Sequence, residues 1–300
     1  MVTTSEVAVE SEIEELTDKR PFMSQLREFG RKQPLGSIGL IIVLVMIFAS
    51  VFAPILTPYD PEANAFEFML TPPNLDFLLG TDQFGRDILS RIIYGARTAL
   101  FVGFTAAFIG ATIGLVLGVA SAFFGGKFDL IFQRVMDVFM AFPLIILALA
   151  VVSIFGTGVQ NVIIAITIPF IPRCARVVRS SALAIREIPY IDAARANGFS
   201  NSRIIMRHMV PNVMAPFLIM ITAFVGQAIL LEASLSYLGL GVQEPVPAWG
   251  LMLQGGAEEY VESAPWVAIW PGVAISLAVF GFNLFGDAVR DTLDPKLRSQ

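Results

Sequence analysis

Residues 192–211 read DAARANGFSNSRIIMRHMVP and lie in a polar, arginine-rich stretch between two strongly apolar segments. The strong helix formers of residues 192–196 predict a short helix. Gly198 predicts its end, because glycine accepts a left-handed backbone. Ser200 is a typical N-cap for a second short helix. Pro211 cannot continue that helix and therefore starts the next apolar segment. Such an element between two apolar segments indicates that another molecule docks on it.

The composition indicates a polytopic membrane protein. Hydrophobic residues make up 55 % of the chain and charged residues only 15 %, with a mean hydropathy of +0.71, whereas soluble domains carry about a quarter charged residues. The single Cys174 excludes a disulfide within the chain, and the single His208 argues against a histidine-based metal site. We expect Cys174 to be a small apolar filler and His208 a polar loop residue.

The segment from Val138 to Pro172 contains no charged residue. As one helix it would reach ~52 Å at ~1.5 Å per residue, against ~30 Å of hydrocarbon. It must therefore fold as a hairpin, with its turn at Gly156–Gly158 and a short fourth span that ends at Pro172. With the other apolar runs this predicts an all-α protein with six transmembrane helices: Ile38–Leu56, Thr98–Phe124, the two halves of Val138–Pro172, Val213–Leu231 and Pro265–Phe285.

Lysine and arginine set the expected orientation. Six spans place both termini on one side. Of the 20 Lys and Arg residues, only Arg86, Arg91 and Arg97 fall on the other side, and the rest lie in the two termini and in the loops 125–134 and 173–212. Because basic loops stay in the cytoplasm, we expect both termini to be cytoplasmic.

Two patterns leave alternatives open. The second span carries small residues four apart, at Ala106, Gly110, Gly114, Gly118 and Ala122. They predict a tight helix contact, either at the bundle centre or subunit interface or in ordinary packing within the subunit. In the second short helix, Ile204, Ile205 and Met209 can form an apolar stripe beside Arg203 and Arg207. Such a stripe is buried either on the bilayer surface or in a groove of a partner.

The quoted segment resembles the cytoplasmic "EAA" loop of inner-membrane permeases of binding-protein-dependent ABC importers. The matching positions are Asp192-Ala193-Ala194, Gly198, His208, Val210 and Pro211. This chain has Asp for Glu, His for Ile and Val for Leu at three of them. Residues 207–212 resemble the variant of the oligopeptide/dipeptide/nickel branch, in its second, "C"-type permease subunit.

Three further stretches resemble the same branch. Residues 79–97 are similar to the segment before its second span. There we expect Thr81 or Asp82 to cap a short helix and Arg86 and Asp87 to face water. The other matches are Asp137 to Ala148, with Ala141-Phe142-Pro143 inside the third span, and Leu231 to Gly241.

The resemblance implies a type I ABC importer permease fold. It divides the chain into a cytoplasmic tail (1–36), a first span with a periplasmic segment (37–96), the transmembrane type-1 core with coupling loop 173–212 (97–290) and a cytoplasmic tail (291–300). The coupling residues implied are Asp192, Ala193, Ala194, Gly198, Ile204, Arg207, His208 and Pro211.

The resemblance also implies partners in a bacterial or archaeal cytoplasmic membrane. A homologous second permease would complete a heterodimer, two ATP-binding subunits would dock on the cytoplasmic loops, and an external solute-binding protein would deliver substrate. The chain itself would bind no nucleic acid, metal or cofactor and catalyse nothing, because ATP and Mg would be used by the ATPase subunits. Dipeptides, oligopeptides, nickel chelates and glutathione-like molecules remain open as substrates.

Candidate pathway or gate residues are Phe142, Pro143, Gln227 and Glu232, with core packing as the alternative role. Glu232 opens the last matched stretch and could join an outer gate. The scarcity of charges within the spans argues against a proton-coupled carrier and offers no acid–base pair for an embedded enzyme. The alternative function is an ATP-independent carrier or channel, which would require coupling residues or inverted repeats.

Overall fold

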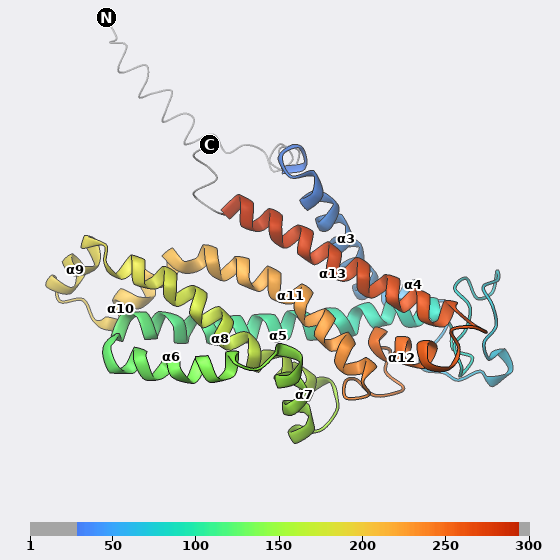
Figure 1. Cartoon of the computed structure of the whole chain (residues 1–300). Coiled ribbons are helices and arrows are strands. Elements are labelled where there is room, and N and C mark those ends of the chain that lie inside the picture. The colour runs from blue at the N-terminus through green and yellow to red at the C-terminus, as the bar shows by residue number, and fades with distance from the viewer. Residues whose placement is uncertain (1–28, 294–300) are drawn as a thin grey trace, which may run out of the picture.

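The computed structural model describes residues 29–293, except for the side chain of Glu258. Most of the predicted tails 1–36 and 291–300 therefore lie outside the described residues. Within residues 29–293 the chain is mostly helical (Figure 1). Five helical stretches are long and apolar enough to cross a membrane. Their principal helices are α3 (Pro34–Val51), α5 (Ile88–Phe124), α8 (Val159–Arg186), α11 (Met214–Tyr237) and α13 (Trp266–Leu293).

The shorter helices are α4 (Ala53–Leu56), α6 (Gly126–Met140), α7 (Leu144–Phe155), α9 (Pro189–Ala196), α10 (Asn201–Ile204) and α12 (Trp249–Glu259). The predicted spans one, two, five and six are found as α3 with α4, α5, α11 and α13, the last two extended at their C-terminal ends. The number of candidate spans rises to six if the bent pair α6 and α7 forms one span.

The predicted third span is not one straight helix. α6 and α7 meet at an angle of 89° around residues 141–143. Pro143 precedes α7 as its N-cap residue, because proline has no N–H to donate and pushes the residue before it away from helical geometry. The predicted hairpin turn is confirmed, since α7 ends at Phe155, α8 begins at Val159, and Gly156 and Gly158 have φ of +88° and +116°.

The predicted end of the fourth span at Pro172 is wrong. α8 contains Pro169 and Pro172 and continues to Arg186. The first part of the predicted loop 173–212 is therefore helical. The charges that suggested a loop are accommodated on the helix, because Arg176 and Arg179 form ion pairs with carboxylates of α6.

The small-residue positions of α5 pack against α8 within the subunit. A Cβ atom on Gly110 would lie 2.9 Å from Cβ of Phe170, and one on Gly114 would lie 2.6 Å from Cβ of Cys174. At Gly118 the carbonyl oxygen of Ala175 would be 2.6 Å away. The stripe thus serves close packing inside this chain, which was one of the two expected alternatives.

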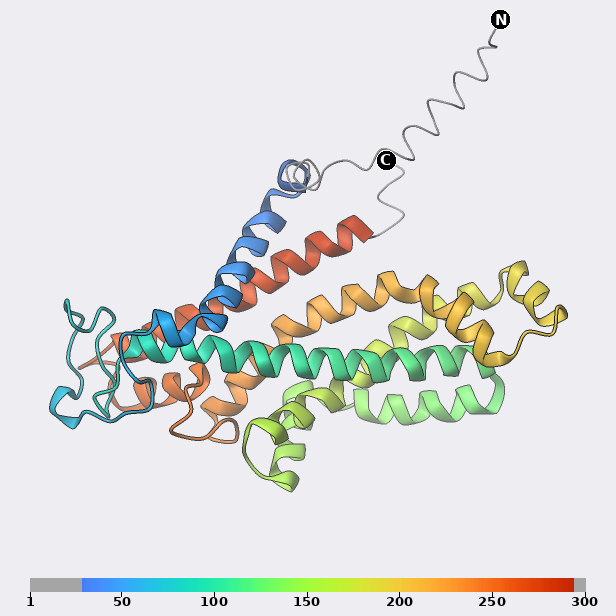
Figure 2. The same cartoon turned by 180° about the vertical axis from the view of Figure 1, so that it is seen from behind.

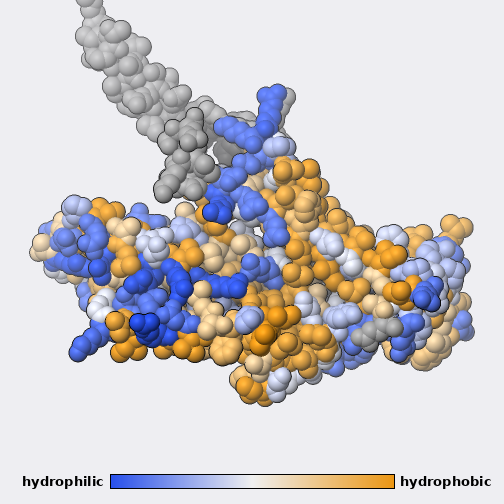
Figure 3. All heavy atoms as spheres, in the orientation of Figure 1, coloured by the Kyte–Doolittle hydropathy of each residue, from blue (hydrophilic) through white to orange (hydrophobic). Residues whose placement is uncertain are grey.

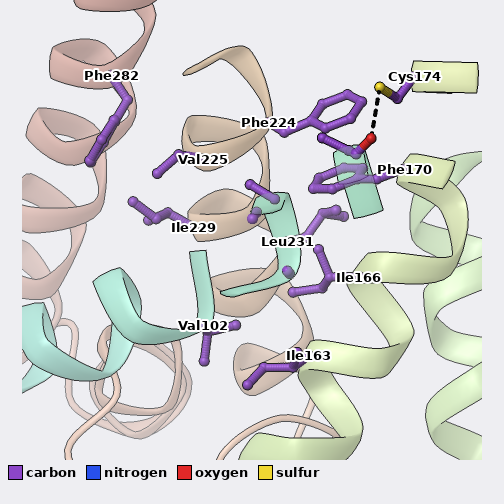
Figure 4. Close-up of a cluster of buried hydrophobic side chains, with 14 of the residues drawn as sticks. Val102, Ile163, Ile166, Phe170, Cys174, Phe224, Val225, Ile229, Leu231 and Phe282 are labelled. Carbon is purple, nitrogen blue, oxygen red and sulfur yellow. Dashed lines mark hydrogen bonds between the residues drawn. The ribbon is translucent and has the colours of Figure 1, made fainter. Parts of the chain in front are cut away.

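The core continues from this contact to α11 and α13 (Figure 4). The Phe170 and Phe224 rings stack with their centroids 4.2 Å apart. The Cys174 thiol donates a hydrogen bond of 3.3 Å to the carbonyl oxygen of Ala111. Cys174 is fully buried, as expected of a small filler.

α5 runs along the length of the molecule. It lies behind α8 in Figure 1 and in front of α8 in the reverse view of Figure 2. α9 and α10 lie at one end (Figure 1). At the other end lie α12 and the segment before α5; we call this the loop end, formed by residues 53–87 and 238–265. α3 and α13 lie side by side, and a Cβ on Gly39 would be 2.7 Å from the carbonyl oxygen of Gly281.

Candidate functional site

The first candidate site is the helix–glycine–helix segment, which we define as residues 187–213. Its first helix, α9, buries Ile191 and Ala194 at 0 % and 6 % exposure. Asp192 and Ala193 are exposed. α9 is thus held on the protein by its apolar side and presents these two residues on its other side.

The turn between the two helices is formed by Gly198 and Ser200, as predicted. Gly198 has a φ of +75°, where L side chains are strained, and its N–H donates to the carbonyl oxygen of Arg195 at 2.9 Å. A Cβ there would meet no atom within 4 Å, so the backbone conformation and not crowding requires glycine. The Ser200 hydroxyl accepts a hydrogen bond of 3.4 Å from the Arg203 N–H and caps α10.

The predicted end of the second helix at Pro211 is wrong. α10 passes into a π-helical turn (Ile205–Met209) and a 3₁₀ turn (Val210–Val213) before α11, so the helical path is unbroken. Proline lacks an N–H, and its ring crowds the carbonyl group four residues earlier. A wider turn followed by a tighter one accommodates this conflict without ending the helix.

The apolar stripe of the second helix faces the protein's own core. Ile204 and Met209 are 0 % exposed, and Ile205 packs beside them. Both expected destinations of the stripe, the bilayer surface and a partner groove, are therefore wrong. The helix buries its apolar face inside the subunit and leaves its polar face exposed.

That polar face contains a residue that the sequence reasoning missed. Met206 is 63 % exposed and lines a shallow pocket together with Arg203 and Arg207. The Arg203 guanidinium lies 4.1 Å over the Phe199 ring. The i, i+3 and i+4 spacing of residues 203, 206 and 207, which places them side by side on a helix, is the signal that could have found it.

His208 links the two halves of the segment. The Tyr190 hydroxyl donates to the carbonyl oxygen of His208 at 3.2 Å, and the Asn212 amide donates to the same oxygen at 2.6 Å. The His208 ring lies 5.9 Å from the Tyr190 ring and 6.1 Å from the Phe199 ring, between centroids. These contacts fix α9 against the second helix.

At the loop end, buried charges join the segment before α5 to the loop after α11. Arg86 donates to Asp82 at 2.7 Å and to Glu244 at 2.6 Å. Arg91 is fully buried, 3.6 Å from Asp82 and 3.5 Å from Glu244. We call these four residues the charge clasp. The expectation that Arg86 and Asp87 face water is wrong, because they are 4 % and 3 % exposed.

The expected helix cap in this region is also wrong. Asp87, and neither Thr81 nor Asp82, caps α5, by accepting from the Ser90 N–H at 2.8 Å. Asp82 instead accepts from the Arg86 N–H at 2.9 Å and so closes the tight turn before the helix. The Asp82 carboxylate therefore both accepts the hydrogen bond that closes the turn and forms an ion pair in the charge clasp.

The charges of the clasp change the pKa of its exposed member. Burial by itself raises the pKa of Glu244, but hydrogen bonds from Arg86 and the charges of Arg91 and Arg86 outweigh it and hold that pKa below its ordinary value of 4.5. Burial lowers the pKa of Arg86, yet the hydrogen bond to Glu244 and the charge of Asp82 leave it raised. Both groups are therefore charged at neutral pH.

Indole groups add a second tie at the loop end. Trp249 of α12 donates to the carbonyl oxygen of Ile92 at 3.0 Å, and Trp266 of α13 donates to that of Thr81 at 3.2 Å. α12 is therefore bound to the start of α5, although more than 150 residues separate them.

The candidate pathway residues have different surroundings. Phe142, Pro143 and Gln227 are exposed on this chain. Glu232 is 1 % exposed and accepts from the Ser236 hydroxyl at 2.7 Å, while its Oε2 atom has no hydrogen-bond partner among the described residues. The structure thus does not bring Glu232 to the same surface as the other three.

The helices that are long and apolar enough to cross a membrane make this a polytopic membrane protein. The chain belongs to the family described as "Binding-protein-dependent transport system inner membrane component", which matches residues 110–299. Residues 25–73 match "N-terminal TM domain of oligopeptide transport permease C". The chain is therefore a multi-pass inner-membrane permease subunit of a binding-protein-dependent importer, a family that works with ATPase and binding-protein partners.

Curated relatives cover nearly the whole chain. It is 43 % identical to a putative peptide transport system permease of Brucella suis, over 93 % of this chain and 94 % of that protein. It is 40 % identical to the di/tripeptide permease DppC of Pseudomonas aeruginosa, with 93 % and 94 % coverage. It is 41 % identical to the glutathione permease GsiD of Escherichia coli, with 93 % and 92 % coverage.

A solved structure shares the fold. The inward-facing MetNI methionine ABC transporter has a chain that superposes with a TM-score of 0.56 at 21 % identity, over 69 % of this chain and 98 % of that chain. The type I ABC importer permease fold expected from the sequence is thereby confirmed.

Proposed function

We propose that this chain and a homologous second permease form a heterodimeric pathway for dipeptides, oligopeptides or a similar small solute such as glutathione. The names of the relatives, which cover more than nine-tenths of the chain, support this substrate class. The observation that carries the transport role is the exposed helix–glycine–helix segment at one end of the spans.

The ATP-binding subunits dock on this segment. Its apolar face is already used inside the subunit, so the contact is made by the exposed Asp192, Ala193, Gly198, Met206 and Arg207. ATP and Mg act in the partner subunits, and this chain is not catalytic. Closure of the ATPase pair moves the segment as a rigid body and switches the direction in which the pathway opens.

The charge distribution supports the orientation. The lysine and arginine bias places both termini and the helix–glycine–helix segment in the cytoplasm. The loop end then faces outward, toward the solute-binding protein. Phe142, Pro143 and Gln227 lie on the exposed surface between these ends and line the pathway, whereas Glu232 acts from inside the subunit on the outer loop.

Copurification tests this function. The tagged chain is co-expressed with the products of its neighbouring genes and solubilised gently. It is expected to retain the second permease and two ATPase subunits. Reconstituted with the binding protein, the complex should take up peptide only when ATP is supplied.

The alternative function is an ATP-independent carrier or channel. It predicts a chain that purifies alone and transports without nucleotide. That result, obtained with a complex that is intact by size-exclusion chromatography, would contradict the proposed function.

A further inference from the structure

Arg173 lies within a membrane-spanning helix and far from its ends. It is fourteen residues after Val159, the first residue of α8, which corresponds to ~21 Å at ~1.5 Å per residue. Its neighbour Gln227 is ten residues before Tyr237, the last residue of α11, or ~15 Å along that helix. In a hydrocarbon layer ~30 Å thick both side chains lie well inside the span.

Three arginines of α8 are spaced three residues apart, and two of them are neutralised. Arg176 forms an ion pair with Asp137 of α6. Arg179 donates from its Nε atom to Asp129 of α6 at 2.6 Å. Arg173 differs: among residues 29–293 it forms no ion pair with a carboxylate. The one hydrogen bond of its side chain to a described residue runs from Nη1 to Oε1 of Gln227, at 3.4 Å.

A charged group at this depth is costly to expose to lipid, and such groups almost always face the bundle interior or a water-filled cavity. Arg173 is partly exposed and Gln227 exposed on the surface of this chain. Hydrophilic residues gather in a band on the face seen in Figure 3, which reaches from α9 to the middle of the molecule. The surface that Arg173 and Gln227 share therefore borders either a water-filled pathway or the second permease.

We propose that Arg173 and Gln227 form a carboxylate-binding site in the translocation pathway, and that its ligand is the terminal carboxylate of the transported peptide. A guanidinium recognises a carboxylate through two parallel hydrogen bonds. Gln227 offers its Oε1 atom to Arg173, which leaves its Nε2 amide group to donate to the same ligand. The carboxylate of the ligand supplies to Arg173 the countercharge that α6 supplies to Arg176 and Arg179.

This inference rests on the proposed function, since it assigns a chemical group of the peptide to a place in the pathway. The site uses one arginine and one amide, and a conduction site must bind its ligand weakly enough to release it. Peptides and glutathione all carry a terminal carboxylate, so the inference holds for either.

The test uses the complete complex in proteoliposomes, with its binding protein and radiolabelled L-alanyl-L-alanine or glutathione. Arg173→Gln is expected to lower uptake at least about tenfold, as loss of a charge-assisted pair predicts, while the ATPase activity stimulated by the loaded binding protein persists. Arg173→Lys should recover part of the uptake. Gln227→Glu, which places a competing carboxylate beside Arg173, should lower uptake as much as Arg173→Gln. Arg97→Gln, an exposed arginine of α5, is the matched control and should transport like the wild type.

Unchanged uptake by Arg173→Gln or by Gln227→Glu would overturn the carboxylate site and leave the proposed function intact. Loss of the second permease from the purified Arg173→Gln complex would also overturn it, by showing that Arg173 belongs to the interface. A wild-type complex that hydrolyses ATP but takes up neither probe would instead contradict the proposed function, and with it the site.

Discussion

At the loop end, the two arginines of the charge clasp are removed from water and paired with carboxylates, whereas at the helix–glycine–helix end the charged side chains lie in water. Arg91 is fully buried in the charge clasp. The ion pair of Asp192 with Arg195 is made by side chains that are 72 % and 42 % exposed. The loop end is therefore held together by buried ion pairs as part of the fold. The other end keeps its polar groups available to a partner.

The largest expected effect is on transport and comes from Gly198→Val. A β-branched residue at φ +75° costs about 1–2 kcal/mol of backbone strain, so the turn changes shape and ATP-driven uptake should be abolished while membrane insertion is normal. Uptake in proteoliposomes and the yield of folded protein are the measurements. Gly126→Val is the matched control, because Gly126 has a φ of +56° and equally open surroundings but lies outside the segment. Normal uptake by Gly198→Val would count against coupling through this turn.

The largest effect on stability is expected for Arg86→Met, which breaks the clasp. Removing one member of a buried ion pair costs about 3–5 kcal/mol, and we expect the lower value because Arg91 still faces both carboxylates. Thermal unfolding in detergent measures it. Arg97→Met, at an exposed arginine of α5, should leave the midpoint unchanged. Equal thermal midpoints for both variants would show that the charge clasp does not stabilise the fold.

The clasp also predicts a pH dependence. The pKa of Glu244 is lowered in the folded chain, so its contribution to stability is complete above the ordinary value of 4.5 and is lost as the pH falls through the lowered pKa. The thermal midpoint of the wild type should therefore exceed that of Glu244→Gln at pH 7 and approach it in acid. A constant difference between the two down to pH 3 would argue that Glu244 does not titrate with unfolding.

A smaller effect is expected for Trp249→Phe. The substitution removes the indole hydrogen bond to the carbonyl oxygen of Ile92 and should cost about 1 kcal/mol. Thermal unfolding again gives the value. Trp270→Phe is the control, because the indole of Trp270 donates to no described residue. Similar losses for both variants would mean that packing, and not the hydrogen bond, ties α12 to α5.

The smallest effect is expected for Asp192→Asn. An exposed ion pair contributes less than about 0.5 kcal/mol, which corresponds to a shift of the midpoint by no more than ~2 °C. A larger shift would show that the helix–glycine–helix end is fastened like the loop end and would remove the contrast between them.

The sequence predicted those features whose causes are local. The absence of charge from Val138 to Pro172 required a hairpin, and the turn was found at its glycines. Gly198 and Ser200 act as their chemistry predicts. The resemblance of the helix–glycine–helix segment identified the family before any contact was known.

Features that depend on distant parts of the chain could not be predicted. The burial of Arg86 requires Glu244, which lies 158 residues away. The continuation of α8 through its arginines requires the carboxylates of α6. Hydropathy measures how apolar a stretch is and not the direction of its helix axis. The sequence therefore did not predict the bend of 89° between α6 and α7, although Pro143 lies at the bend.

The close packing of α5 on α8 has a mechanical consequence. α5 is 37 residues long, or about 55 Å at ~1.5 Å per residue. Its first turn carries Arg91 of the charge clasp, and near its last turn the carbonyl oxygen of Ala122 accepts from Arg186 of α8 at 2.8 Å. The close approach of the two helices at Gly110, Gly114 and Gly118 leaves little room for one to slide on the other. We therefore expect the two helices to move together when either end of the pair is displaced.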